Sequence, residues 1–256
     1  MAIRRLAWTT AVASCLLFTM NSAAPQARSS ASISGFHYEL VDLAPNDAVA
    51  PSISLAPTRI LGESFLFLQT FTFPVSEAST NVFGAVSVEN AFGRGSASLA
   101  PDYDARSVAE AQTYSARSGT LVDLAFVLSP NTRVIFSADA VASALPQNGF
   151  TFAEAALIGE ITTPFISHGT SFSASVHANL GEEARLLSAV ANADAVEAAG
   201  TLSIRSAAWA ESFAAPIPEP RTSAMLLAGI MVLLARGSAE RVKKTPGQGA
   251  SSKTVR

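Results

Sequence analysis

Short segments in which apolar and polar side chains alternate, separated by turn residues, run through the chain from residue 33 to residue 213. In residues 121–128, one alternating set of side chains is strongly apolar: Val122, Leu124, Phe126 and Leu128. A period of two is that of a β-strand, because successive side chains point to opposite faces. Pro130 and Asn131 then form a turn signal. Strands of this length with frequent turns predict an all-β domain, an antiparallel sandwich or jelly roll, over residues 32–215.

Other strands follow from the same pattern. Residues 132–145 continue the alternation after the turn, and five of their side chains share one face: Val134, Phe136, Ala138, Ala140 and Ala142. Residues 65–73 place Phe65, Phe67, Phe71 and Phe73 on one face, which predicts a central core strand. Residues 33–43 predict a half-buried strand, with Phe36, Tyr38 and Leu40 on its inner face. Further strands are expected at 149–161, 171–180 and 201–213.

Glycine and proline suggest interruptions elsewhere. Pro51 and Pro57 predict an irregular stretch between the first strands. Gly84 predicts a bulge in a strand over 82–92, and residues 93–95 (Gly-Arg-Gly) predict a turn. Residues 107–117 are polar and are expected to form an exposed strand.

Residues 184–199 are rich in alanine and leave two alternatives open. Alanine is the best helix former, so a helix is one of them. However, Ala189, Ala191, Ala193 and Ala195 keep strict period two, which favours a strand.

The N-terminus has the pattern of a secretory signal peptide, which we assign to residues 1–31. Arg4 and Arg5 precede an apolar stretch from Leu6 to Met20, and small residues follow. Cleavage is expected after Ala23 or after Ala31. The only cysteine, Cys15, ends a sequence that approximates a lipobox, so lipidation is the alternative to an ordinary signal peptide. The mature domain has no cysteine, and it therefore depends on its apolar core rather than on disulfides.

The exported domain is strongly acidic, although the whole chain has a net charge of only −3. Residues 32–217 contain seven arginines, no lysine and 18 acidic residues, a net charge of −11. A surface of this charge is not expected to bind nucleic acid or an anionic bilayer. The excess of basic residues lies at the two ends of the chain, and this distribution follows the positive-inside rule for a chain whose domain is outside the membrane.

Residues 216–244 combine a proline-rich segment, a short apolar run and a basic cluster, in that order. The prolines hold the chain extended. The run from Thr222 to Ala235 is 14 residues long and contains no charge, somewhat short for a membrane span of about 20 residues. Arginine and lysine side chains at its end can extend its reach by snorkelling. We therefore expect a short transmembrane helix, followed by a disordered basic tail over residues 245–256.

The order of these features resembles the PEP-CTERM sorting signal of exported proteins of Gram-negative bacteria. The resemblance identifies Pro218, Glu219 and Pro220 as the recognition triplet. It implies a cytoplasmic basic anchor, formed by Arg236, Arg241, Lys243 and Lys244. It also implies two partners, the Sec translocon and a membrane-embedded exosortase that cuts near the triplet. The expected product is first anchored in the inner membrane and then reaches the outer surface or an extracellular polysaccharide matrix.

The sequence contains no recognisable catalytic or metal-binding motif. Its three histidines, His37, His168 and His177, lack the close spacing of a zinc site, so no metal or other cofactor is expected. Asp102 and Asp104 resemble half of a calcium loop, and a surface turn is the preferred interpretation. No serine lies in a nucleophile elbow.

Two functions fit these observations. The first is an exported structural or interaction protein of the cell surface or extracellular matrix, without catalysis. The alternative is a secreted carbohydrate-binding module or glycan hydrolase with the same sorting tail. A cleft with aromatic side chains and paired carboxylates would favour the alternative. Trp209 is the only tryptophan of the domain, and its position near the tail is taken as evidence against a binding platform.

Overall fold

The computed structural model describes residues 27–68, 74–146, 149–163 and 169–213. These residues belong to the first of two units into which the chain divides, Met1–Ala214. The second unit, Ala215–Arg256, lies outside the described residues, and so do the expected transmembrane helix and the sorting residues. The described residues form strands and no helix, and none of them belongs to a helix able to cross a membrane.

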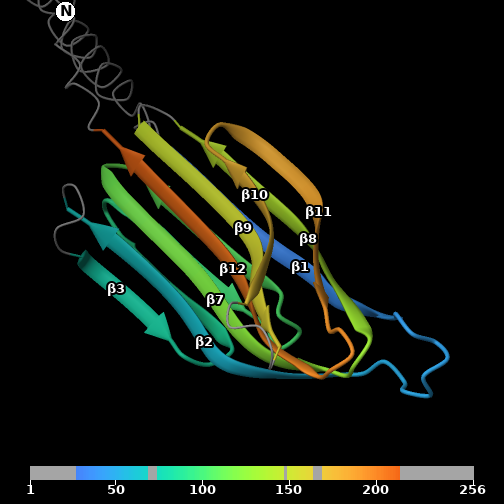
Figure 1. The fold of residues 1–256 in the computed structure, drawn as a ribbon. Coiled ribbons are helices and arrows are strands. Elements are labelled where there is room, and N and C mark those ends of the chain that lie inside the picture. The colour runs from blue at the N-terminus through green and yellow to red at the C-terminus, as the bar shows by residue number, and fades with distance from the viewer. Residues whose placement is uncertain (1–26, 69–73, 147–148, 164–168, 214–256) are drawn as a thin grey trace, which may run out of the picture. The chain divides into compact units, whose positions relative to one another are not determined.

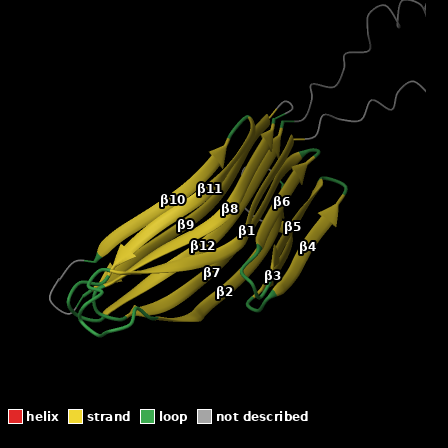
Figure 2. Cartoon of the chain, turned by 90° about the vertical axis from the view of Figure 1, so that its right-hand side faces the viewer, coloured by secondary structure: helices red, strands yellow, loops and turns green. Residues whose placement is uncertain are grey.

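In the part of the chain that the structure describes, twelve strands form two antiparallel sheets of six strands each. Sheet A has the order β11 (Gly181–Asn192), β8 (Thr132–Leu145), β1 (Ala27–Asp42), β6 (Ala105–Ala111), β5 (Gly93–Leu99) and β4 (Gly84–Asn90). Sheet B has the order β10 (Thr170–Ala178), β9 (Gly149–Thr162), β12 (Ala198–Ser212), β7 (Tyr114–Leu128), β2 (Ile53–Phe67) and β3 (Pro74–Thr80). The sheets stack as two layers (Figures 1 and 2), so the prediction of an all-β antiparallel sandwich is confirmed.

The main core lies between the sheets and is built by the alternating strands identified from the sequence. On β7, Val122, Leu124, Phe126 and Leu128 are at most 1% exposed, and the predicted inner face of β8 is buried as well. The rings of Phe126 and Phe136 meet edge to face, with 5.4 Å between their centroids. The turn at residues 130–131 is also confirmed.

A belt of buried hydroxyl groups separates this core from a smaller apolar cluster at the other end of the strands. On β12, Leu202 and Ile204 belong to the main core, Ser206 to the belt, and Ala208 and Ala210 to the smaller cluster. The same order occurs along neighbouring strands, and the buried belt comprises Ser29, Ser64, Ser107, Ser118, Thr120 and Ser206. Several of these groups satisfy one another: Ser64 with Ser118 at 2.8 Å, Ser107 with Ser206 at 2.7 Å, and Thr120 with Ser206 at 2.8 Å.

The prediction that the phenylalanines after residue 64 face the core is wrong for Phe65 and Phe67. Both are half-buried on the outer face, whereas Leu66 between them is 1% exposed. The cause is a bulge, because Pro57 pairs with Leu124 and Arg59 with Asp123, which leaves Thr58 without a pairing position. One extra residue exchanges the two faces of a strand. Residues 69–73 lie outside the described residues, and β2 is next to an edge of sheet B rather than central.

Other glycine and proline predictions are also corrected. Pro57 lies within β2, so the stretch before residue 65 is mostly regular strand. Gly84 begins β4 rather than forming a bulge within it. Residues 93–95 belong to β5, and the turn precedes them at residues 91–92. Residues 107–117 form parts of two strands, β6 and β7, and most of them are buried rather than exposed.

In β1, Phe36 and Leu40 pack against the core as expected, but Tyr38 is 45% exposed. A second bulge, between Ser34 and His37, turns the even-numbered residues of this strand inward, and Tyr38 shares that face because it pairs with the buried Phe136. The strand also begins at Ala27, so residues 27–31 lie in the sandwich although the sequence placed them in the signal peptide.

The alanine-rich segment is a strand, and the helical alternative for residues 184–199 is wrong. It forms β11 as far as Asn192, with Ala189 and Ala191 buried, and a short connection then leads to β12. Alternation with a buried face therefore outweighs the helix propensity of alanine here.

Candidate binding groove on sheet B

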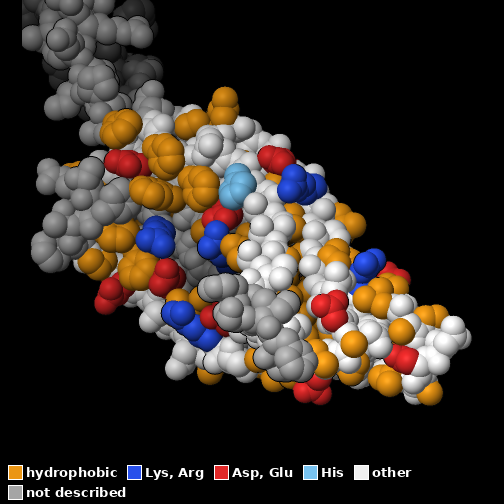
Figure 3. Space-filling model, in the orientation of Figure 1, with side chains coloured by type: hydrophobic (Ala, Val, Ile, Leu, Met, Phe, Trp, Pro, Cys, Tyr) orange, Lys and Arg blue, Asp and Glu red, His pale blue; other side chains and the backbone are white. Residues whose placement is uncertain are grey.

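The outer face of sheet B carries a groove of about 400 Å³ lined by β2, β7, β9 and β12. Apolar and charged side chains gather side by side on this face (Figure 3). Its lining includes Trp209 and Phe152 together with two arginines and two glutamates, Arg117, Arg205, Glu63 and Glu154. Residues far apart in the sequence meet here because antiparallel register places them in rows across the sheet.

Small residues form the floor of the groove. Ala207 pairs with Gly119 on one side and with Glu154 on the other, and Gly119 pairs with Glu63. The resulting row across four strands is Glu154, Ala207, Gly119, Glu63. A depression forms because its two central positions carry a methyl group and a hydrogen, whereas the rows on both sides carry large side chains.

Aromatic side chains and an arginine form one wall. In the next row, Trp209 pairs with Phe152 and with Arg117, and Arg117 pairs with Phe65. Phe150 meets the indole of Trp209 edge to face, with 5.4 Å between ring centroids. Aromatic rings at such positions offer apolar surface at little cost in conformational entropy. The opposite wall contains Arg205 and Leu121, which pair with each other.

The four charged groups form two arginine–glutamate pairs. Nη2 of Arg117 lies 3.9 Å from Oε1 of Glu63, and the side chain of Arg205 donates a hydrogen bond to Glu154. The arginine side chains are 55% and 42% exposed, so the pairs contribute little to stability. They do fix donors and acceptors at opposite sides of the groove.

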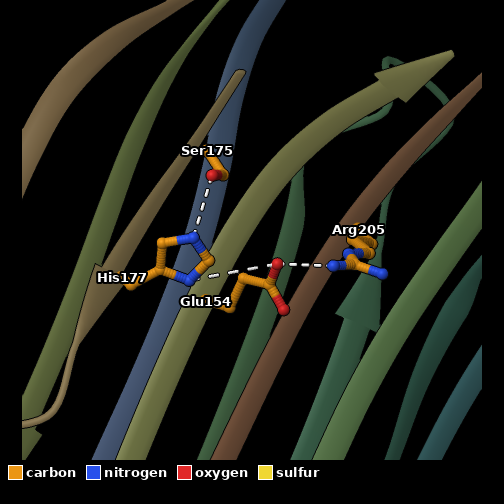
Figure 4. A network of polar contacts seen from close by, with 4 residues as sticks. All are labelled: Glu154, Ser175, His177 and Arg205. Carbon is orange, nitrogen blue, oxygen red and sulfur yellow. Dashed lines mark hydrogen bonds and ion pairs between the residues drawn. The ribbon is translucent and has the colours of Figure 1, made fainter. Parts of the chain in front are cut away.

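A polar network extends the second pair to the edge of the sheet (Figure 4). Nδ1 of His177, on β10, lies 4.0 Å from Oε1 of Glu154, and its Nε2 is 2.9 Å from the hydroxyl of Ser175. Glu154 on β9 therefore lies between His177 and Arg205 of β12. Contacts from two neighbouring strands hold its carboxylate in place.

Two hollows of sheet A are larger than this groove and differ from it in chemistry. One, of about 470 Å³, is lined by serines and by Arg28, Arg94 and Arg106. Arg28 and Arg94 both contact Glu110, at 3.2 and 2.7 Å. The hydrogen bond from Arg94 to Glu110 raises the pKa of the arginine.

The larger hollow, of about 670 Å³, lies where Phe83 and the 100–104 turn meet the outer face of sheet A. Its only carboxylate, Asp104, accepts a hydrogen bond from the Gly35 N–H at 2.9 Å. Neither hollow of sheet A brings an indole together with paired charges, as the sheet B groove does.

The residues singled out in the sequence fall into three groups. The PEP-CTERM residues and His168 lie outside the described residues. His37 is exposed, and Asp102 and Asp104 form a surface turn as predicted. Within the described part of the chain, no three His, Cys, Asp or Glu side chains are placed to hold a metal ion. Trp209, in contrast, lies within a strand that has neighbours on both sides, so its nearness to the tail is no evidence against a platform.

Sequence reasoning missed the other groove residues because no motif connects them. Phe152 and Glu154 do alternate with buried residues, and so do Arg205 and Trp209. The pattern therefore shows that each pair faces outward. Only the order and register of the strands show that these four residues lie close together on the same face of sheet B.

No family model, no curated protein and no solved structure matches this chain. The functional proposal therefore depends on the sequence features and on the geometry of the domain.

Proposed function

We propose that the chain is an exported, non-catalytic binding protein of the cell surface or extracellular matrix, and that it holds its ligand in the sheet B groove. The observation that carries this proposal is the groove itself: a floor of small residues between an aromatic wall and two arginine–glutamate pairs. Concave sites with apolar walls and a few placed polar groups are typical of ligand binding. Extracellular polysaccharide is the partner that suits a matrix location.

The glutamates are placed for binding rather than for glycoside hydrolysis. Glu154 and Glu63 occupy strands three positions apart in sheet B, so their backbones are separated by roughly 14 Å. The carboxyl groups of glycosidases lie about 5 to 9.5 Å apart. Each carboxylate is also engaged by an arginine of the neighbouring strand, Glu63 by Arg117 and Glu154 by Arg205.

A glycan hydrolase remains the second candidate, because both carboxylates line one groove beside an indole. Incubation of the purified chain with a panel of polysaccharides, followed by an assay for new reducing ends, separates the two functions. We expect no product. Turnover that disappears in both Glu63→Gln and Glu154→Gln would establish the hydrolase and end the non-catalytic proposal.

Export and sorting form the other part of the proposal and depend on the two chain ends. We propose that the Sec translocon exports the chain, that residues 216–244 anchor it in the inner membrane, and that an exosortase cuts near Pro218, Glu219 and Pro220. Arg236, Arg241, Lys243 and Lys244 hold the cytoplasmic side. Mass spectrometry of the surface protein should find a C-terminus near residues 218–220. A surface protein that still ends at Arg256 would contradict this sorting step.

A further inference from the structure

We infer that the sheet B groove binds an uncharged glycan chain that lies across the strands, along the row Glu154, Ala207, Gly119, Glu63. This inference rests on the proposed binding function and adds the chemical class and direction of the ligand. It is carried by three features of the groove: its charge, its combination of surfaces and its length.

The charge of the groove selects an uncharged ligand. Its two arginines and two glutamates sum to zero, and residues 27–213 around them contain eight arginines, no lysine and 18 acidic residues, a net charge of −10. A polyanion approaching this domain meets general repulsion without a local basic patch to offset it. A polycation would be attracted to the domain as a whole, but inside the groove it would meet Arg117 and Arg205. A neutral chain meets neither obstacle.

The surfaces of the groove match the two surfaces of a sugar ring. A pyranose has a face of C–H groups and a rim of hydroxyl groups. The C–H face suits the wall formed by Trp209 and Phe152, which are half-buried and therefore already held in place. The hydroxyl rim suits the paired charges, since the guanidinium groups donate hydrogen bonds and the carboxylates accept them.

The length of the groove suits a short segment of a polymer. Its floor crosses four strands, from β9 to β2, and therefore spans roughly 14 Å between the outer backbones, comparable to about two or three sugar rings. The row of small residues runs across the strands, so a chain lying in it meets Glu154 and Arg205 near one end and Glu63 and Arg117 near the other.

The test uses Trp209 as an internal fluorescent probe. The chain has two tryptophans, Trp8 and Trp209, so the full-length chain carrying Trp8→Phe reports on the groove alone. It is titrated with three neutral hexasaccharides, cellohexaose, mannohexaose and xylohexaose, and with a hexamer of alginate as the acidic probe. We expect at least one neutral probe to change the emission of Trp209 in a saturable way, and the alginate hexamer to leave it unchanged.

Matched substitutions on β7 place the binding in the groove. A Cβ at Gly119 would have its nearest neighbours at 3.6 and 3.8 Å, which is ordinary contact, so Gly119→Val extends a side chain over the floor from a Cβ that has room. Ala125, on the same outer face of β7 but outside the groove, provides the control Ala125→Val. We expect Gly119→Val to weaken binding about tenfold or more, with unchanged thermal unfolding, and Ala125→Val to leave binding unchanged.

Each other outcome overturns the inference. Binding of the alginate hexamer alone would show an acidic ligand, and equal losses in both valine variants would place the site elsewhere. The absence of any response, confirmed by calorimetry with the same probes, would exclude a neutral glycan. An acidic ligand, or the absence of any response, leaves the proposed binding function standing for a ligand of another class, such as a peptide. That function fails on different evidence, namely glycan turnover that needs Glu63 and Glu154.

Discussion

Ser206 of β12 and Ser107 of β6 lie in different sheets, and their hydroxyl oxygens are 2.7 Å apart in the interior of the sandwich. Ser206 also bonds the hydroxyl of Thr120 at 2.8 Å. Ser107 and Thr120 are both buried, so neither hydroxyl group can form a hydrogen bond to water instead when the hydroxyl of Ser206 is removed. The hydroxyl belt therefore makes the middle of the sandwich sensitive to the loss of a single oxygen atom.

We expect Ser206→Ala to lower the free energy of unfolding by roughly 1 to 3 kcal/mol, because Thr120 is left without this buried partner. Ser203→Ala, on the outer face of the same strand, should cost less, since its hydroxyl contact with Asp123 is only part-buried. Replacing all three belt groups together, as Ser107→Ala, Thr120→Val and Ser206→Ala, should restore part of the loss. Urea unfolding of the four proteins measures these differences. A triple variant that is less stable than Ser206→Ala alone would contradict this explanation.

Gly95 on β5 is expected to tolerate no larger residue. A Cβ at this position would lie 2.3 Å from the hydroxyl oxygen of Ser64 and 2.7 Å from that of Ser118. Gly95→Ala must therefore separate the sheets or break the bond between these serines, at a cost of about 1 to 3 kcal/mol. Gly119→Ala is the matched control, because its new methyl group has room. Equal melting temperatures for Gly95→Ala and Gly119→Ala would contradict this prediction, because they would show that Ser64 and Ser118 can move aside without loss of stability.

The start of β1 predicts where the signal peptide is cut. Ala27, Ser29 and Ala31 are buried, and residues 27–33 pair with β6. Cleavage after Ala23 keeps this part of the strand, whereas cleavage after Ala31 removes it from the centre of sheet A. Mass spectrometry of the exported protein should find an N-terminus before Ala27. A chain that begins at Ser32 and unfolds at the same temperature as one that begins at Ala24 would contradict the prediction.

Removal of β12 should prevent folding altogether. This strand pairs with β9 on one side and with β7 on the other, so without it sheet B falls into two separate parts. A chain that stops after Glu197 is expected to lack the far-ultraviolet signal of a folded sheet protein and to be digested rapidly by protease. A chain that stops after Phe213 keeps every strand that the structure describes and should resist digestion. Protease resistance of the chain that stops after Glu197 would contradict this prediction, because it would show that the remaining strands can fold without β12.

The sequence predicted the fold best where alternation continues over a long strand. Val122 to Leu128 and Val134 to Ala142 show one apolar face each, and both faces are buried. Alternation fails as a guide where a strand contains a bulge, because the extra residue reverses the inner and outer faces. Phe65 was assigned to the core from alternation alone, and it lies on the outer face beyond the bulge of β2.

The groove was beyond prediction for a different reason. Arg117 and Trp209 are 92 positions apart in the sequence and become neighbours only through the pairing of β7 with β12. Nothing local to either residue determines that pairing, since strand order in a sandwich depends on the packing of the whole domain. The sequence pattern predicted that each side chain points outward, but it did not predict the row that the side chains form together.

The bulge at Thr58, whose hydroxyl donates a hydrogen bond to the carbonyl of Asp123 at 3.0 Å, acts well beyond its immediate surroundings. Deleting this one residue would turn the rest of β2 inside out, with Phe65 directed into the sandwich and Leu66 out to water. The groove would lose one end of its wall at the same moment as the interior became overfilled. Ligand recognition and folding thus both depend on the extra residue at position 58. Natural selection that keeps this residue for one of the two properties therefore also keeps it for the other.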